Sequence, residues 1–337
     1  MLAYVHAVRR ELEATARVEP LETIYFGGGT PSLLPPSGIA TLLEIIGAHA
    51  RDAEITLEAN PEDVTDEAAR VWRAAGINRV SLGVQSFQDP VLRWMHRVHD
   101  ADRARAAVRT LRAAGFDNVS LDLIFAVPVG LQRDWARDLD EVLALEPDHL
   151  SLYGLTVEPR TPLHRWIARG AANAPSDERY ADEYLASHER LHRAGYAFYE
   201  VSNAARNGRH SRHNRAYWTG QPYAGAGPAA HSFDGRVRRW NLSAWEAYRR
   251  ALEAGRSPVE SEELLTDEQR EIERLYLGLR TIDGLALASM DALRSRLSPL
   301  LQQGWLIEQA ERVRCSVEGW LRLDSLVAAL TGPVAIS

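Results

Sequence analysis

The stretch Thr23-Ile-Tyr-Phe-Gly-Gly-Gly-Thr-Pro-Ser32 joins a short β-rich run to three consecutive glycines. Glycine has no Cβ, so three in a row let the backbone approach a ligand and turn its N–H and C=O groups toward it. A short strand followed by a helical segment recurs along the first half of the chain, which predicts parallel strands joined by crossover helices. We expect these strands at residues 23–26, 54–58, 79–84, 118–125 and 149–155.

Amphipathic segments of helical length separate the strands, at residues 39–49, 66–75, 101–114 and 134–145. A further helix, at 4–15, leads directly into the first strand, whereas each unit of a parallel barrel begins with a strand. We therefore predict an α/β protein with a partial (β/α)6 parallel barrel that lacks its first strand.

The second half has a different pattern of glycine and proline, and it predicts an α+β region. We place the barrel in residues 1–160, an extension in 161–242 and a helical module in 243–337. In that module, two helices near 267–279 and 287–297 precede a two-strand pattern at 305–308 and 313–316, which is typical of a winged-helix-like fold. The predicted wing is not basic, so partner docking is favoured over DNA binding.

The composition is that of a globular protein, with 45% hydrophobic and 25% charged residues among 337. No apolar stretch is long enough to span a membrane, and residues 1–10 do not resemble a signal peptide. The net charge of -7 is dispersed, which disfavours a nucleic-acid partner. We expect a cytoplasmic protein.

Two residue types are nearly or wholly missing. The chain has no lysine, which excludes Schiff-base chemistry and the lysine of a phosphate-binding P-loop. Cys315 is the only cysteine, so disulfides and cysteine-ligated clusters within one chain are excluded. Its alternating surroundings predict a half-buried strand cysteine.

Polar residues follow the predicted strands at their carboxyl ends, where parallel barrels place their active sites. Glu58, Gln85 and Thr156 stand at or just beyond a strand end, and Asp122 lies within the predicted strand at 118–125. Arg97, which we place on the helix after Gln85, is suited to bind a carboxylate through its guanidinium. A capping or ion-pair role is an alternative for any single one of them. Together they predict a site for a small ligand with amines and hydroxyls.

Longer motifs surround these positions. They are 27–32 (GGGTPS), 58–62 (EANPE), 79–87 (RVSLGVQSF), 122–125 (DLIF), 149–159 (HLSLYGLTVEP), 199–203 (YEVSN), 211–218 (SRHNRAYW) and 227–233 (GPAAHSF). The chain resembles the radical S-adenosylmethionine superfamily, in the branch of HemW-type haem chaperones and HemN-type oxygen-independent coproporphyrinogen III dehydrogenases. The last three motifs resemble the HemW type.

The resemblance implies that the barrel mouth binds S-adenosylmethionine. The implied contacts are Gly28, Gly29, Thr30, Glu58, Gln85, Arg97, Asp122 and Thr156. It also implies haem as a second ligand, with His213 as the candidate ligand of the iron because Tyr217 and Trp218 beside it suit a porphyrin face. His210 and His231 are lesser candidates, and a hydrogen-bonded loop histidine is the alternative for each.

The superfamily also carries a [4Fe-4S] cluster on a Cys-x3-Cys-x2-Cys motif, which would stand before residue 1 here. Cys315 alone cannot hold that cluster. Either the recorded start lies downstream of the true one, or the chain is a relative without a cluster. We favour the first explanation, because a barrel without its first strand exposes the edge of the next one.

These inferences lead to the hypothesis of a HemW-type chaperone that binds haem and passes it to an acceptor protein. One alternative is the dehydrogenase, which the 211–218 motif disfavours; another is a scaffold without catalysis whose C-terminal module docks a partner. His96 and His99 are interpreted as a surface pair on a helix. Ala126, Arg160 and Ala229 replace glycines of the family pattern, which predicts a Cβ at positions with unusual backbone torsions.

Overall fold

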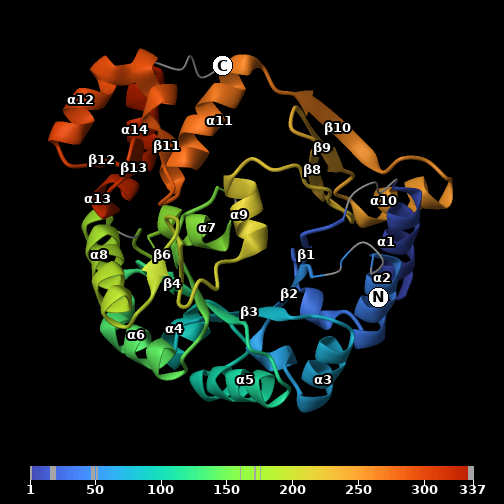
Figure 1. Cartoon of the computed structure of the whole chain (residues 1–337). Coiled ribbons are helices and arrows are strands. Elements are labelled where there is room, and N and C mark those ends of the chain that lie inside the picture. Colours follow the sequence, from blue (N-terminus) through green and yellow to red (C-terminus); the bar gives the residue numbers. More distant parts are fainter. Residues whose placement is uncertain are drawn as a thin grey trace.

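A curved seven-stranded sheet is the centre of the fold (Figure 1). The computed structural model describes residues 2–15, 20–46, 50, 52–159, 161–170, 172–174 and 176–332. The strand order is β1-β2-β3-β4-β5-β7-β6. Strands β1 to β5 are parallel to one another, and β7 pairs antiparallel with both β5 and β6. The strands are β1 (Thr23–Phe26), β2 (Glu54–Ala59), β3 (Arg79–Gln85), β4 (Val119–Phe125), β5 (His149–Gly154), β6 (Ala197–Phe198) and β7 (Asn203–Ala205). The five predicted parallel strands are confirmed.

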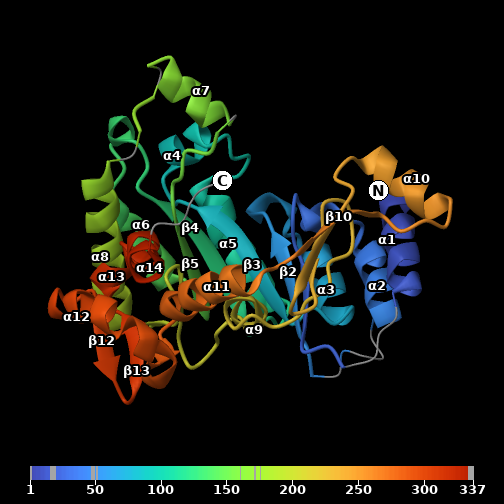
Figure 2. The same cartoon turned by 90° about the horizontal axis from the view of Figure 1, so that it is seen from above.

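Helices cover the convex side of this sheet (Figures 1 and 2). Side-chain caps define where several of them begin, since Thr65, Asp100, Asp134 and Ser176 each accept a hydrogen bond from a backbone N–H of the first turn. The helices of this half are α1 (Leu2–Ala14), α2 (Pro36–Ile46), α3 (Asp66–Ala74), α4 (Asp89–Trp94), α5 (Ala101–Ala113), α6 (Trp135–Ala144), α7 (Pro162–Ala168) and α8 (Asp177–Arg193). Short 3-10 turns lie at η1 (Pro31–Leu33), η3 (Pro61–Asp63) and η4 (Val129–Leu131).

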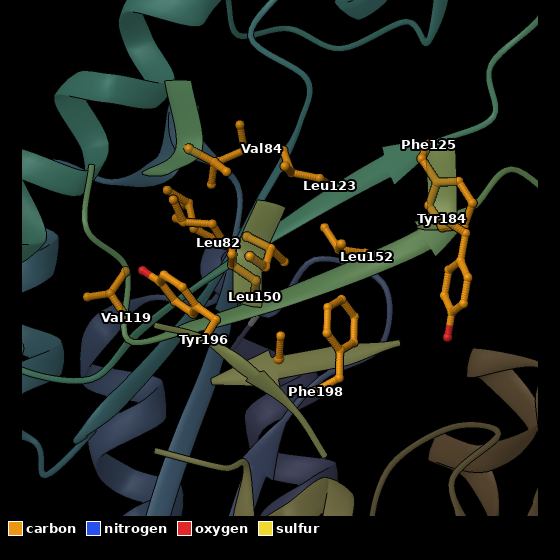
Figure 3. Packing of buried hydrophobic residues seen from close by; sticks show 14 of the residues in the cluster. Leu82, Val84, Val119, Leu123, Phe125, Leu150, Leu152, Tyr184, Tyr196 and Phe198 are labelled. Atoms are coloured by element: carbon orange, nitrogen blue, oxygen red, sulfur yellow. The ribbon is translucent and has the colours of Figure 1, made fainter. Parts of the chain in front are cut away.

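The core lies between the sheet and the helices (Figure 3). Strand side chains alternate between two faces, so Leu82, Leu121 and Leu150 contribute to one buried face while their neighbours point the other way. Those neighbours are polar: Ser81 bonds to Asp122, and Ser120 bonds to His149. The concave side of the sheet is therefore a hydrogen-bonded polar lumen.

Helix α9 (Arg212–Trp218) and a three-stranded sheet complete the middle of the chain, with strand order β10 (Val259–Leu264), β9 (Val237–Asn241) and β8 (His231–Phe233). Hydrogen bonds to the Glu11 carboxylate of α1 link this helix to the sheet and to α10 (Trp245–Glu253). Glu11 is only 8% exposed and accepts hydrogen bonds from Gly227 N (2.8 Å), Asn241 Nδ2 (2.6 Å) and the Tyr248 hydroxyl (2.5 Å). A buried carboxylate requires such partners.

The C-terminal module is an α+β unit, as predicted. Its elements are α11 (Asp267–Arg280), β11 (Leu285–Ala286), η5 (Leu287–Leu293), α12 (Arg294–Gln302), β12 (Leu306–Gln309), β13 (Arg312–Cys315), α13 (Val317–Trp320) and α14 (Leu323–Thr331). The helix expected at 287–297 is instead a 3-10 turn followed by α12. Cys315 is fully buried rather than half-buried, and burial raises the pKa of its thiol to about 12. No helix in the described part of the chain is long and apolar enough to cross a membrane.

Two of the three glycine replacements lie at left-handed backbone positions, as expected. Ala126 has a φ of 56° and Ala229 a φ of 57°, where a Cβ costs conformational energy. Arg160, the third, lies outside the described residues. The protein therefore retains the turns that glycine favours while carrying alanine there.

Ala229→Gly should raise the free energy of unfolding. Relief of about 1 to 2 kcal/mol of torsional cost, less about 0.4 to 1 kcal/mol for the more flexible unfolded chain, leaves a gain of about 1 kcal/mol. Ala328→Gly, on the exposed face of helix α14, is the matched control and should lower stability instead. Urea unfolding of both variants measures the effect, and a loss of stability for Ala229→Gly contradicts the explanation.

Candidate functional site

The glycine loop after β1 lies at the carboxyl ends of the parallel strands. Gly28 and Gly29 have φ values of 78° and 61°, a conformation that glycine adopts without strain. The Gly28 N–H donates a 3.2 Å hydrogen bond to Oε2 of Glu58, at the end of β2. The loop is thus bent toward the neighbouring strand, and Thr30 follows it at the start of η1.

Glu58 also accepts a hydrogen bond from a side chain of β1. The Tyr25 hydroxyl donates to Glu58 Oε1 at 2.7 Å. Burial and the charge of Glu58 raise the pKa of Tyr25 well above its usual range, so the phenol stays protonated and remains a donor. Tyr25 precedes the glycines by two residues on the inward side of β1, and the sequence analysis did not select it.

Gln85 ends β3 in an irregular conformation. The register between β3 and β4 shifts between Gly83 and Gln85, and Gln85 has a φ of 68°. Its side chain is 8% exposed, and its Oε1 is buried without a hydrogen-bond partner among the described residues. Because buried acceptors are normally paired, this oxygen indicates a place for a ligand donor.

Asp122 lies beside Gln85 on β4 and faces the lumen. The Ser81 hydroxyl donates to it at 3.1 Å. Burial raises the pKa of this carboxyl to about 6, although Ser151, Arg79 and Ser81 oppose the shift. The group therefore changes charge just below neutral pH.

Arg97 and Thr156 have fewer contacts with the other predicted site residues. Helix α4 ends at Trp94, so the placement of Arg97 on a helix is wrong; it lies in the following turn, where its backbone N–H donates to Leu92 O. Its Nη1 bonds to Asn60 Oδ1 at 3.2 Å, and burial lowers its pKa. Thr156 is exposed beyond β5 and bonds only to Gly154 O, at 3.3 Å, in the described structure.

His213 lies on α9, which packs against the other end of β1. Its Nδ1 contacts Thr23 Oγ1 at 2.8 Å and its Nε2 contacts the Tyr217 hydroxyl at 3.1 Å. Its ring stacks on Tyr25 with centroids 4.7 Å apart. Burial and the charge of Arg79 lower its pKa to about 4, so the ring is neutral. Both ring nitrogens are thus engaged by hydroxyl groups.

The other histidines take different places. His210 stacks on Tyr199 at 4.3 Å, and His231 stacks on Trp240 at 6.0 Å. His99 is buried, with its ring nitrogens at hydrogen-bond distance from Glu62 Oε2 (3.0 Å) and Val84 O (3.1 Å). Neither His96 nor His99 lies on a helix, because α4 ends at Trp94. The surface interpretation holds for the exposed His96 and is wrong for His99, which the turn after α4 brings back onto the sheet.

Comparison with known proteins assigns the family. Residues 4–142 match the Radical SAM superfamily. The chain is 40% identical over 333 residues to a Heme chaperone HemW of Mycobacterium tuberculosis, covering 97% of this chain and 85% of that protein. It is 31% identical over 346 residues to the Heme chaperone HemW of Bacillus subtilis, covering 98% and 91%. The chain belongs to the HemW family of radical SAM proteins.

The fold agrees with that assignment. Coproporphyrinogen III oxidase (HemN) from Escherichia coli, a radical SAM enzyme, superimposes with a TM-score of 0.80 over 97% of this chain and 82% of that one, at 22% identity. At this identity the likeness concerns the fold alone.

The radical SAM relationship implies a [4Fe-4S] cluster, but the residues present do not fit one. A cysteine-ligated cluster needs three thiolates, and Cys315 is the only cysteine of the sequence. It is buried in the C-terminal module, and the described residues contain no group of three or more histidine, cysteine or acidic side chains arranged to hold a metal ion. The residues of this HemW-family chain therefore do not suffice to hold a cysteine-ligated cluster.

Asp122→Asn should make stability less dependent on pH. The folded carboxyl has a raised pKa of about 6 against a usual 3.8, so ionisation opposes folding above pH 6 and this cost disappears as pH falls toward 4. The variant should be more stable than the parent by about 1 to 2 kcal/mol at pH 7.5, discounted for partial solvent access, and by much less at pH 4.

Chemical unfolding at the two pH values measures this difference. Asp117→Asn, an exposed position, is the control for removing one negative charge. A stability difference for Asp122→Asn that is the same at both pH values would rule out the raised pKa.

Proposed function

We propose that this chain is a HemW-type haem chaperone, which binds haem and transfers it to an acceptor protein, and that its barrel mouth binds S-adenosylmethionine. The observation that carries the proposal is the 40% identity to a Heme chaperone HemW across 97% of the chain. The 22% identity to the HemN oxidase supports no comparable assignment of that activity.

The chemistry of the mouth supports the second part of the proposal. S-adenosylmethionine carries an amine, a carboxylate, a sulfonium and ribose hydroxyls. Glu58 and Asp122 provide carboxylates for the cationic and hydroxyl groups, and Arg97 provides a guanidinium for the carboxylate. The loop of Gly28, Gly29 and Thr30 presents backbone groups, and the exposed Thr156 is the residue that we assign to the adenine.

The acid–base state of the mouth also matters for such a ligand. Asp122 is ionised above a pH of about 6, so its attraction for a sulfonium or ammonium group is strongest at and above neutral pH. Tyr25 stays protonated and keeps Glu58 oriented toward the glycine loop.

Gln85→Leu should weaken S-adenosylmethionine binding by about tenfold, because the ligand donor then loses its acceptor. Isothermal titration of the purified chain with S-adenosylmethionine measures this. Gln302→Leu, on the exposed face of α12, removes a similar amide away from the mouth and should bind as the parent does. Equal affinities for Gln85→Leu and the parent would contradict the assignment of Gln85.

Haem titration tests the first part of the proposal. The purified chain should bind haem saturably at one site and release it to apomyoglobin added as an acceptor. Failure to bind haem would contradict the chaperone proposal and leave the scaffold alternative.

The His213→Ala variant decides the role of His213 in the same titration. The hydrogen bonds of both ring nitrogens favour a role in positioning Tyr217, so the Soret maximum should stay unchanged while affinity falls. A shifted Soret maximum would instead show that His213 binds the iron.

A further inference from the structure

A groove of about 950 Å³ lies outside the barrel mouth, between the end of α9, the β8–β9 strands and the C-terminal module. These elements can be followed in Figures 1 and 2. The volume is in the range of small-molecule and cofactor sites. None of the residues in the predicted S-adenosylmethionine site lines it.

One wall of the groove is aromatic. Tyr217, Trp218, Tyr223 and Phe233 line it. Tyr217 and Tyr223 meet edge to face with centroids 4.7 Å apart, and Tyr223 and Phe233 are held by two backbone hydrogen bonds of 2.8 and 2.9 Å. The opposite wall includes Leu277 of α11. Such walls accept a flat apolar ligand.

Arginines gather along the groove, although the chain as a whole has a net charge of -7. Four arginines and two carboxylates, Glu273 and Asp283, line the groove, and two of the arginines also pair with carboxylates outside its lining. The arginines are Arg238, Arg270, Arg274 and Arg312.

The four arginines are not equally free. Arg312 donates to the backbone carbonyls of Asp283 and Gly284, and Arg274 forms two hydrogen bonds to Glu271, so both are held by the module itself. Arg238 pairs with Glu273 at 2.6 Å, and Arg270 has a loose ion pair with Asp267 at 3.7 Å. Arg238 and Arg270 retain donors for a ligand, because a guanidinium carries five N–H groups.

We infer that this groove binds the porphyrin of haem, with the macrocycle against Tyr223 and Phe233 and its two propionates held by Arg238 and Arg270. The inference rests on the proposed haem-binding function and locates it. The two propionates match the two arginines that retain free donors, and guanidinium groups bind carboxylates in a bidentate manner. No histidine lines the groove, so the macrocycle and propionates supply the recognition.

His213 does not line the groove, but it contacts Tyr217 of the aromatic wall. Its Nε2 contacts the Tyr217 hydroxyl at 3.1 Å, so it orients a ring that lines the groove. His213 is therefore a positioning residue for this site.

Metal-free protoporphyrin IX tests the groove directly, because its binding needs no iron ligand and is followed by fluorescence. The double variant Arg238→Gln/Arg270→Gln should bind it about tenfold more weakly than the parent does. Arg193→Gln, a 74% exposed position on α8, controls for the loss of positive charge and should bind as the parent does. Circular dichroism and thermal unfolding confirm that each variant is folded.

Protoporphyrin IX dimethyl ester, which lacks the carboxylates, completes the test. The parent should bind the ester about as weakly as the double variant binds the free acid, and the double variant should show no further loss. If the double variant binds the free acid as tightly as the parent, the groove assignment is wrong while the chaperone proposal stands. If the parent binds neither haem nor protoporphyrin, the chaperone proposal itself fails.

Discussion

Tyr25 forms the contact on which both ends of the barrel depend. Its hydroxyl donates a 2.7 Å hydrogen bond to Glu58 at the mouth, and its ring stacks on His213 of α9 with centroids 4.7 Å apart. It stands on β1, which lies at the edge of the described sheet. Helix α9 packs against the inward face of this strand through His213. The Tyr25 side chain therefore orients the Glu58 carboxylate near the glycine loop. It also packs against α9, the helix whose end lines the groove.

The polar lumen explains why so many groups there have altered pKa values. Its side chains are enclosed by the curved sheet, so charged forms are poorly solvated unless they are paired. Asp122 has a raised pKa, whereas burial and Arg79 lower the pKa of His149, whose ring contacts Ser120 and Tyr199 at 2.8 Å each. The lumen thus holds a neutral histidine, His149, and an aspartate, Asp122, whose charge depends on pH.

The sequence predicted the five parallel strands because local signals coincide there: strand-forming runs, helix-ending glycines and capping residues. It also placed Gly28, Glu58 and Gln85 at one edge, since strand ends of a parallel sheet share that edge, whereas Asp122 lies in the middle of β4. It extended the helix after Gln85 to Arg97, although α4 ends at Trp94, and it missed the buried position of His99, which depends on a turn packing back onto the sheet. Burial of this kind is a tertiary property that short-range patterns do not encode.

The groove, too, is a tertiary feature that short-range sequence patterns do not predict. Its lining comes from α9, β9, α11 and β13, which are widely separated along the chain, and no local motif joins Arg238 to Arg270. The 211–218 motif indicated the aromatic wall but assigned the ligand role to His213, whose ring is turned toward Thr23 and Tyr25. The positioning role that we infer for His213 therefore rests on the folded arrangement and not on the motif.

A crystal structure of the chain with bound haem tests the central claim most directly. The account predicts porphyrin density between α9 and α11, with the propionates at Arg238 and Arg270 and the His213 ring still bonded to Thr23 and Tyr217. Density for the macrocycle within the barrel lumen, with the iron on His213, would contradict it.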